Sequence, residues 1–557
     1  MNVSQQRREE SIKRIKEIRD FISHSAQDEN AGRLLTYLSE LEKEIKGKKY
    51  GLVFEEHREK IDETLENYLP VLTEQEDLYI DNGGQMNFLI EGDNLAALQL
   101  LLKTHRGKID LIYIDPPYNT GNKDFIYDDD YVDKNDTFRH SKWISFMEKR
   151  LMLAKCLLKQ GGLLFISIDD NEQSQLILLC NEILGEENCI AILPTIMNLK
   201  GNQDQFGFAG AHEYTLVFTN NVKKATVGMF PIEEEDLGEW QIDSIGYYKK
   251  GANLKATGTN APSKKRPNLY YPIYIERDGS ISVDSQTETS FVVYPITNGE
   301  KMSWRWSKEK VRNESYNLIV EINGKQQISI YKKQRPAIGD LPSKKPKSIF
   351  YRPEYSSGNG TAQLSSLFGY KIFANPKPLE LIMDFIRLSN STVTVLDFFA
   401  GSGTTGHAVL KLNAEDGGTR RFILCTNNEN NICRNITYER IKRVIDKEGY
   451  AASLKYFKID FVRISERLYY EYADELLLHI RELVELENGV NFRNNSEIAI
   501  VLTDEELDAF MENRSALKAC RALYVGHDVL INGRQSAALK RRKIAVNVIP
   551  QYYYEES

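Results

Sequence analysis

The sequence has 557 residues, of which 41% are hydrophobic and 27% charged, with a formal net charge of −8. This length predicts several globular units, and the acidic balance argues against a protein that binds nucleic acid over its whole surface. The apolar runs are too short to span a membrane, and the N-terminus, MNVSQQRREES, lacks the apolar stretch of a secretory signal. The six cysteines are scattered without a C-x-x-C pair, so we expect reduced thiols in a cytoplasmic protein and no metal site.

Residues 1–79 are expected to form a helical N-terminal region. Isoleucines at positions 12, 15, 18 and 22 recur at helical spacing, as do apolar residues at 34, 35, 38, 41 and 45. Amphipathic helices that pack on the main domain or on another subunit explain this pattern.

A short apolar strand and a helix are predicted for residues 87–98, NFLIEGDNLAAL. The strand ends at Gly92, and Asp93 or Asn94 is suited to cap the helix that follows. An N-cap alone explains this pattern as well as a functional site does.

The segment 110–121, DLIYIDPPYNTG, begins as a buried strand that two prolines end abruptly. Asp115 is therefore predicted at the carboxyl end of a strand, where open α/β sheets bind ligands. An exocyclic amine on a base is a poor nucleophile, and the Asp115 carboxylate and the Pro116 carbonyl are suited to accept from it. The ring of Tyr118 is suited to stack on the planar base. A strand that ends in a proline turn is the alternative explanation.

Alternating strands and helices are predicted after this segment. Residues 143–158 and 171–184 have helical periodicity, and residues 161–170 and 210–221 are typical of strands. The alternation predicts an α/β fold with a doubly wound, mostly parallel sheet.

The pattern changes in residues 225–350, which lack helical periodicity and are locally basic. Between positions 249 and 277 there are seven Lys and Arg residues against one acid, Glu276. In an acidic chain, such a local excess is where contacts with DNA phosphates are expected, although a solvated insertion is the alternative. The candidate contacts are Lys249, Lys250, Lys255, Lys264, Lys265 and Arg266.

A glycine-rich turn between a strand and a helix is predicted in residues 390–410, NSTVTVLDFFAGSGTTGHAVL. Gly401 and Gly403 allow the backbone to approach a ligand closely at the start of the helix. The turn is neither a P-loop nor a dinucleotide-binding G-x-G-x-x-G motif.

DPPY and DFFAGSGTT together resemble the DNA amino-methyltransferases, which methylate N6 of adenine or N4 of cytosine. The order of the two motifs resembles the β class, and the surrounding sequence resembles the modification subunits of type III restriction-modification systems. The resemblance implies a Rossmann-like methyltransferase sheet and S-adenosyl-L-methionine as cofactor. It implies a catalytic role for Asp115, Pro116, Pro117 and Tyr118. It implies cofactor contacts from Asp93, Asn94, Lys377, Asp397, Phe399, Ala400, Gly401, Gly403 and Thr404. Thr426 occupies the place of the usual ribose-binding acid, so Glu429, three residues later, is the candidate for that contact.

The domain plan that follows has five parts. They are the helical region 1–79, the catalytic half 80–224, a target-recognition domain 225–350, the cofactor-binding half 351–450 and a small α/β accessory domain 451–557.

The predicted function is transfer of a methyl group to N6 of a flipped adenine in double-stranded DNA. Methylation of N4 of cytosine, and a DNA-recognition subunit that mainly serves a separate ATP-dependent endonuclease, are the alternatives. The resemblance also implies a homodimer and, as a possible partner, a restriction subunit with ATPase and endonuclease activity.

Overall fold

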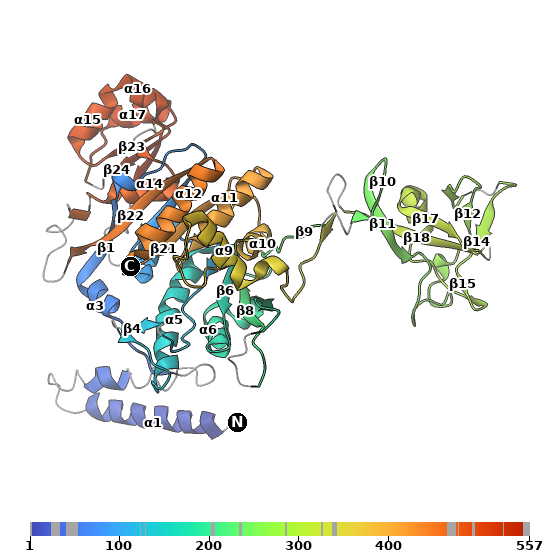
Figure 1. The fold of residues 1–557 in the computed structure, drawn as a ribbon, viewed down its shortest axis with the longest axis horizontal. Helices are drawn as coiled ribbons and strands as arrows, with labels where there is room; N and C mark the ends of the chain where they lie inside the picture. The colour runs from blue at the N-terminus through green and yellow to red at the C-terminus, as the bar shows by residue number, and fades with distance from the viewer. Residues whose placement is uncertain are drawn as a thin grey trace. The chain divides into compact units, whose positions relative to one another are not determined.

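The computed structural model describes residues 3–23, 34–39, 54–122, 124–127, 130–201, 207–232, 237–284, 287–324, 327–336, 342–464, 475–476, 478–492, 496–526 and 528–549. The chain divides into two compact units (Figure 1). Residues 228–347 form the second unit, and the residues on either side of it form the first. None of the described helices is long and apolar enough to cross a membrane.

A nine-stranded, mostly parallel sheet is the centre of the first unit, with strand order β1-β22-β2-β21-β20-β3-β6-β8-β7. The six strands from β22 to β6 run parallel, and antiparallel strands complete both edges. The strands are β1 (Tyr68–Glu74), β2 (Gln85–Glu91), β3 (Ile109–Ile114), β6 (Leu158–Ile168), β7 (Cys189–Ile196), β8 (His212–Thr219), β20 (Thr394–Asp397), β21 (Arg421–Thr426) and β22 (Ala452–Arg463). The predicted fold class, α/β with a mostly parallel sheet, is confirmed.

Helices cover both faces of this sheet, so its central strands are mostly apolar, with polar residues such as Asp110 of β3 and Asp397 of β20 near their ends. In β3, Ile112 and Ile114 pack with residues of α4 and α5, whereas Tyr113 on the opposite face stacks on Phe385 of α10. Between β1 and residue 492, the helices of this unit are α4 (Asn94–His105), α5 (Arg139–Leu157), α6 (Gln173–Leu184), α9 (Ser357–Phe368), α10 (Leu379–Arg387), α11 (Thr404–Asp416), α12 (Glu439–Glu448) and α14 (Ile480–Asn488). A short hairpin, β4 (Ile126–Tyr127) and β5 (Asp130–Tyr131), follows the DPPY segment.

The adjacent strands β3 and β20 form the switch point of the sheet. Val395 and Leu396 of β20 pair with Leu111 and Ile112 of β3. After β3 the chain continues through α5 to β6 on one side, and after β20 it continues through α11 to β21 on the other. Connections that leave in opposite directions open a crevice at the carboxyl ends of the two strands, which is where such sheets bind ligands.

The expected boundaries at both ends of the chain need correction. The N-terminal region has the helices α1 (Val3–Ser23) and α3 (Lys60–Asn67) and a helical segment at 34–39, but residues 68–74 form strand β1 rather than part of a helical region. Leu69, Val71 and Leu72 of β1 are buried against the sheet. Positions 41 and 45 lie outside the described residues. Strand β22, predicted to begin a separate unit, pairs along its length with β1 and β2.

A small α/β layer follows, with its own apolar core. It contains a parallel sheet, β23-β24-β25, whose strands span Ile498–Val501, Ala522–Val525 and Ala545–Val548. Its helices are α15 (Asp504–Glu512), α16 (Arg514–Ala519) and α17 (Gly533–Arg541). The strands and the helix predicted around 498–502, 504–513 and 544–550 are found there.

The second unit is built almost entirely from short antiparallel strands, as its lack of helical periodicity predicts. Its core includes Leu254, Ile273, Trp304, Val311 and Ile330. The main sheet, β10-β11-β18-β17, uses Gln241–Asp243, Gly246–Asn253, Ile328–Gln334 and Leu318–Ile322. The other elements are β12 (Ile273–Ile275), β13 (Ile281–Ser282), β14 (Phe291–Val293), β15 (Ile296–Thr297), β16 (Glu300–Lys301) and α8 (Lys308–Glu314). Strands β9 (Phe230–Pro231) and β19 (Ser343–Lys344) pair close to its two ends.

Candidate active site

The two sequence motifs meet at the switch point of the sheet. Residues 115–118 directly follow β3, and residues 398–403 directly follow β20. A cavity of about 440 Å³ lies between them. Of the predicted residues, it is lined by Asp93, Asn94, Asp115, Pro117, Phe399, Gly401 and Glu429. The other predicted residues, Pro116, Tyr118, Lys377, Asp397, Ala400, Gly403 and Thr404, are not part of this lining.

Asp115 belongs to a cluster of four polar side chains. Its Oδ1 accepts from the Tyr118 hydroxyl at 2.9 Å and lies 3.2 Å from Lys377 Nζ. Lys377 also donates to the two carboxylate oxygens of Glu213, at 2.9 and 3.0 Å, and to the Tyr118 hydroxyl at 2.5 Å. Lys377 lies two residues before α10, separated from it by Pro378, and Glu213 is the second residue of β8. Lys377, which was predicted to contact the cofactor, lies between the carboxylates of Asp115 and Glu213.

Burial and charge act in opposite directions within this cluster. Burial by itself would lower the pKa of the Lys377 ammonium, but the Asp115 and Glu213 carboxylates outweigh it, and the net effect raises the pKa. Burial raises the pKa of Glu213, with Lys377 opposing the shift and Asp115 adding to it. Burial, followed by Asp115, raises the pKa of Tyr118 well above its usual range, so the hydroxyl stays protonated. With both acids ionised, the cluster carries one net negative charge beside the cavity.

The glycine turn after β20 is held from behind by residues that do not line the cavity. Asp397 accepts from the Phe399 backbone N–H at 3.0 Å and from Thr405 Oγ1 at 2.5 Å. Burial raises the pKa of Asp397 to about 7. Gly401 and Gly403 have φ values of 49° and 75°, in the left-handed region that favours glycine. Of the predicted residues of this turn, Phe399 and Gly401 therefore line the cavity, whereas Asp397 supports the turn from outside the cavity.

Asp93 caps a helix, as predicted, and also lies at the cavity. Its Oδ1 caps α4 by accepting from the Leu95 N–H at 2.7 Å, and the residue also lines the cavity. Asn94 bonds the Phe398 carbonyl at 3.0 Å and accepts from Arg150 Nε at 2.5 Å. Arg150 is almost fully buried and forms a two-bond ion pair with Glu59, at 2.8 and 3.0 Å. Both of these residues line the cavity, and no sequence motif marks them.

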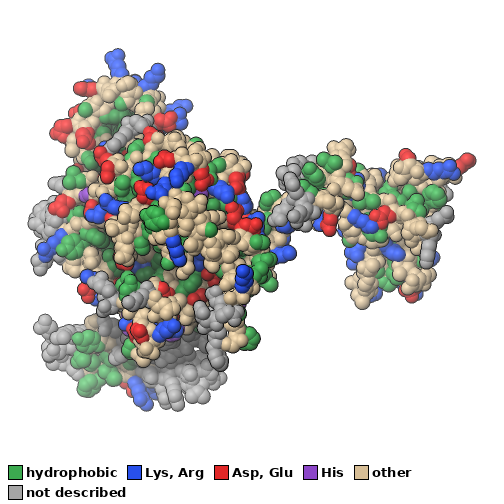
Figure 2. Space-filling model, in the orientation of Figure 1, with side chains coloured by type: hydrophobic (Ala, Val, Ile, Leu, Met, Phe, Trp, Pro, Cys, Tyr) green, Lys and Arg blue, Asp and Glu red, His purple; other side chains and the backbone are tan. Residues whose placement is uncertain are grey.

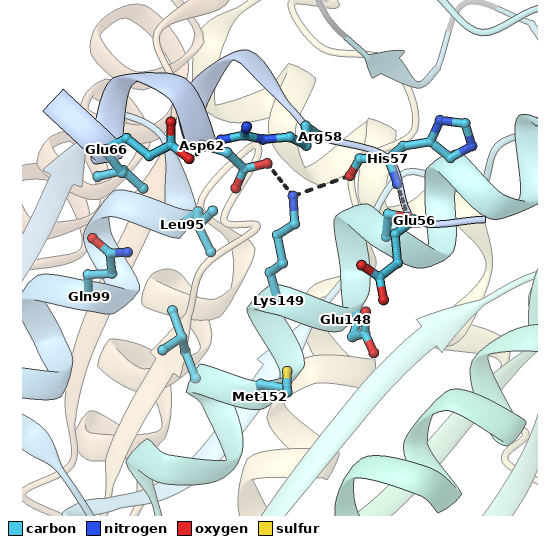
Figure 3. A pocket seen from close by; sticks show the side chains of 13 residues that line it. Glu56, His57, Arg58, Asp62, Glu66, Leu95, Gln99, Glu148, Lys149 and Met152 are labelled. Carbon is cyan, nitrogen blue, oxygen red and sulfur yellow. Dashed lines mark hydrogen bonds and ion pairs between the residues drawn. The ribbon is translucent and has the colours of Figure 1, made fainter. Parts of the chain in front are cut away.

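A second and larger cavity, of about 640 Å³, contains none of the predicted residues (Figure 3). It lies among α3, α4 and α5 and includes Glu56, Glu148, Gln99 and Met152. Its central cation, Lys149, already contacts Asp62, the His57 carbonyl at 3.5 Å and Glu59 at 3.6 Å. We therefore assign the chemistry to the smaller cavity, which Asp115 lines.

The six candidate DNA contacts lie in the second unit, where basic and acidic side chains are intermixed (Figure 2). Lys249 pairs with Glu239 at 3.8 Å and Lys250 with Glu321 at 2.5 Å. Lys255 and Lys265 donate to the backbone carbonyls of Ile296 and Thr259, each at 2.8 Å. Lys264, Lys265 and Arg266 form an exposed run. Tyr271 and Trp304, which the sequence placed among the basic residues, are part of the core instead.

Comparison with known proteins agrees with this geometry. A family model described as a DNA methylase matches residues 109–439. The type III restriction-modification enzyme EcoPI Mod subunit of Escherichia phage P1 is 42% identical over 419 residues, which are 69% of this chain and 62% of that protein. The type II methyltransferase M.KpnI of Klebsiella pneumoniae is 35% identical over 341 residues, 60% of this chain and 79% of the relative.

A third relative is the type III restriction-modification enzyme StyLTI Mod subunit of Salmonella typhimurium. It is 33% identical over 396 residues, which are 65% of this chain and 56% of the relative. The chain thus spans less than two thirds of the length of either type III relative. The family model, by contrast, matches more than half of the chain and includes both motifs of the cavity. The chain belongs to the DNA methylase family.

Proposed function

We propose that this protein transfers a methyl group from S-adenosyl-L-methionine to N6 of an adenine in double-stranded DNA. The observation that carries the proposal is that one cavity is lined both by Asp115 and Pro117 and by Phe399 and Gly401. A methyl donor and an acceptor amine must meet in one place for direct transfer. Similarity to the EcoPI and StyLTI Mod subunits further supports a role as the modification and DNA-recognition subunit of a type III system.

The residues of the cavity fit this cofactor. When bound, S-adenosyl-L-methionine supplies an electrophilic methyl group on a cationic sulfur. Phe398 and Phe399 offer apolar surface, and the acids Asp93 and Glu429 suit hydroxyl and amine donors. A Cβ added at Gly401 would meet nothing closer than Phe373 Cζ at 3.6 Å, so the turn leaves open space beside the chain.

Asp115 and its neighbours would act on the target base. The Asp115 carboxylate and the Pro116 carbonyl accept from the adenine amino group and direct the nitrogen lone pair toward the methyl group. Positive charge develops on that nitrogen during transfer, and the net negative charge of the cluster formed by Asp115, Tyr118, Glu213 and Lys377 stabilises it. The Lys377 ammonium lies at the hydroxyl end of the Tyr118 ring, 2.5 Å from the hydroxyl oxygen and 4.9 Å from the ring centre, so it does not by itself select a ring face for a stacked base.

The second unit is our candidate for target recognition. It is an independent compact body with its own core, inserted between the two halves of the methylase sheet. Its exposed basic run, at positions 264–266, would contact phosphates. Exchange of residues 228–347 with those of a relative should change the methylated site and preserve the chemistry.

Methylation of N4 of cytosine is the competing reaction, because the same geometry would hold that amine. The competing role is that of a DNA-recognition subunit that acts mainly for a separate endonuclease. The similarity to Mod subunits supports a restriction subunit with ATPase activity as a partner, and we extend the proposal to a homodimer in the cytoplasm. Co-purification with a large ATPase and the mass of the purified protein in solution test these points.

Methylation of DNA with tritiated S-adenosyl-L-methionine, followed by digestion to nucleosides, tests the proposed reaction. We expect label in N6-methyl-2′-deoxyadenosine, and none when Asp115 is replaced by Ala. Binding of the cofactor to Asp115→Ala, measured by calorimetry, should persist and shows that the variant is folded. Label in N4-methylcytosine would overturn the choice of base, and no label would overturn the activity. Sequencing of modified bases then identifies the target site.

A further inference from the structure

The residue that follows Tyr118 is held in an unusual way. Asn119 is completely buried, and its φ of 57° places it in the left-handed region, which asparagine adopts more readily than other non-glycine residues. Its Nδ2 donates to the carbonyl of Arg139 at 3.1 Å and to Oε1 of Glu172 at 2.5 Å. The backbone direction after the catalytic tetrapeptide therefore depends on two partners that lie elsewhere in the chain.

Glu172 connects this segment to two helices. It directly precedes α6, is fully buried, and its Oε1 also lies 2.7 Å from His140 Nδ1 at the start of α5. Arg139 Nε contacts the other ring nitrogen, Nε2 of His140, at 3.1 Å. Arginine has only donors, so Nε2 must accept, and the hydrogen of the neutral ring is on Nδ1. Oε1 of Glu172 thus receives two hydrogen bonds.

Two buried oxygen atoms remain without a partner among the described residues. They are Oε2 of Glu172 and Oδ1 of Asn119. Rotating the Asn119 amide would not help, because its oxygen would then face the Arg139 carbonyl, which is also an acceptor. Two acceptors cannot satisfy each other unless one of them carries a hydrogen. A proton on Oε2 of Glu172 would supply the missing donor and close a ring of two hydrogen bonds with the amide.

The surroundings of Glu172 favour that protonated form. Burial raises its pKa to about 8, whereas the Asn119 hydrogen bond and the Arg139 charge lower it and Asp169 raises it further. Burial and the Arg139 charge lower the pKa of His140, so its ring is neutral when Glu172 holds its proton. Arg139, His140 and Asp169 are the charged and titratable groups that face this carboxyl.

We propose that Glu172 is a neutral carboxylic acid that forms a reciprocal pair of hydrogen bonds with Asn119 and so positions Tyr118 for methyl transfer. The functional part of this proposal rests on the proposed function. Trp143, one turn along α5 from Arg139, donates its Nε1–H to the Pro117 carbonyl at 2.7 Å. The N-terminal part of α5 therefore bonds to the chain on both sides of Tyr118, at Pro117 and at Asn119. Glu172 stabilises the contact at Asn119.

Thermal unfolding of Glu172→Gln at several pH values tests the protonation state without requiring any activity. The glutamine amide reproduces the neutral acid, because it accepts at Oε1 and donates to Asn119 Oδ1. A carboxyl whose pKa is about 8 in the folded protein and about 4.5 in the unfolded chain stabilises the fold fully below pH 4.5 and loses this effect as the pH rises to 8. Wild type and variant should therefore have similar Tm values at pH 5, and the variant should have the higher Tm at pH 9.

An exposed acid beyond the far end of α6, Glu187, supplies the matched control. Glu187→Gln should leave the difference in Tm from wild type the same at pH 5 and pH 9. If Glu172→Gln is destabilised equally at both pH values, Glu172 is ionised in the folded protein and the proposal is overturned. The Tm comparison gives its answer even if the wild type transfers no methyl group to DNA. Such a lack of transfer would overturn only the proposed function.

Kinetics then separate positioning from bulk stability. Glu172→Gln should keep most of the kcat of the wild type and lose less activity above pH 8. Glu172→Ala should lower kcat by about 10- to 100-fold, because small displacements of reacting groups cost rates of this order. Its KM for S-adenosyl-L-methionine should change little. A Gln variant as slow as the Ala variant would mean that the charge of Glu172, and not its neutral form, is required.

Discussion

At the scale of single residues, the Asp115 carboxylate shares its cation with a second acid, Glu213. Lys377 lies 3.2 Å from Asp115 and 2.9 Å from Glu213, so its positive charge is divided between them. If Glu213 were absent, the same ammonium would neutralise Asp115 and weaken its attraction for a developing positive charge. Nothing in the sequence marks Glu213, one of 80 acids, because its partner is 164 residues away.

Replacement of Glu213 by Gln tests this division of charge. We expect kcat to fall at least about 10-fold, which corresponds to about 1.4 kcal/mol in the barrier. The Kd for S-adenosyl-L-methionine should be nearly unchanged, because Glu213 does not line the cavity. In a double variant, Lys377→Met should restore part of the lost rate, since the uncompensated cation is then removed. An unchanged kcat in Glu213→Gln, or a double variant no faster than the single one, would contradict the charge-sharing account.

Tyr118 has more contacts than a stacking role requires. Its hydroxyl donates to Asp115 and accepts from Lys377, so Tyr118→Phe should lose a bond to charged groups worth about 1.5–3 kcal/mol. We expect kcat to fall about 10- to 150-fold. Tyr118→Ala should lose about 1–3 kcal/mol more through stacking.

Single-turnover methylation measures both losses, and 2-aminopurine at the target position reports whether the base leaves the stack. Tyr118→Phe should flip the probe as well as wild type does, because the ring is kept. Full activity in Tyr118→Phe would show that the hydroxyl contacts contribute nothing to transfer.

At the scale of elements, the glycine turn after β20 allows two effects of a substitution to be distinguished. One is backbone strain, and the other is the loss of open space in the cavity. Gly401 and Gly417 both have left-handed backbones, at φ values of 49° and 69°, and neither has a close neighbour at the position of a Cβ. Only Gly401 lines the cavity, whereas Gly417 ends α11.

Gly401→Leu should therefore abolish binding of S-adenosyl-L-methionine in calorimetry. Gly417→Leu carries a similar backbone strain and should bind normally. If both variants lost binding equally, strain and not occlusion would be the cause.

The strands next to the two motifs could be predicted from the sequence, but β22 and both edge strands could not. Strands that are buried on both faces appear in the sequence as apolar runs. The predictions of β3 and β20 therefore also located the two motifs that directly follow these strands. The edge strands β1 and β7 contain Pro70 and Pro194, which interrupt the pattern and are tolerated only at a sheet edge. The Lys377 cluster, the Arg150–Glu59 pair and the Asn119–Glu172 pair are joined across long stretches of sequence and leave no local signal.

At the scale of the whole molecule, the basic excess that predicted DNA contact is partly neutralised inside the second unit. Lys333 and Arg335 share Asp243 at 2.6 Å each, and Lys250 pairs with Glu321. The exposed run at 264–266 is therefore the stronger candidate for binding to phosphates.

Gln at positions 264, 265 and 266 together should weaken DNA binding and lower its salt dependence. The slope of log K against log salt should fall by roughly 0.9 for each phosphate that the variant no longer neutralises. Lys250→Gln is the matched control and should leave that slope unchanged. Fluorescence anisotropy with labelled DNA at several salt concentrations measures both. An unchanged slope in the triple variant would mean that another surface of the protein binds the phosphates.

The pairing of β9 with β19 has a consequence for how the chain folds. Pro231 lies opposite Ser343 and Phe230 opposite Lys344, so the second unit begins and ends at adjacent points. Without that pairing, bringing β20 beside β3 would require closure of a loop longer than the roughly 120 residues of the insert. Once the insert has folded and joined its own ends, the loop that β20 must close against β3 loses the residues of the insert and becomes a little more than half as long. By the logarithmic dependence of loop entropy on length, this difference is worth about 0.5 kcal/mol. The order of events that it favours is an insert that folds first and a sheet that assembles around its base.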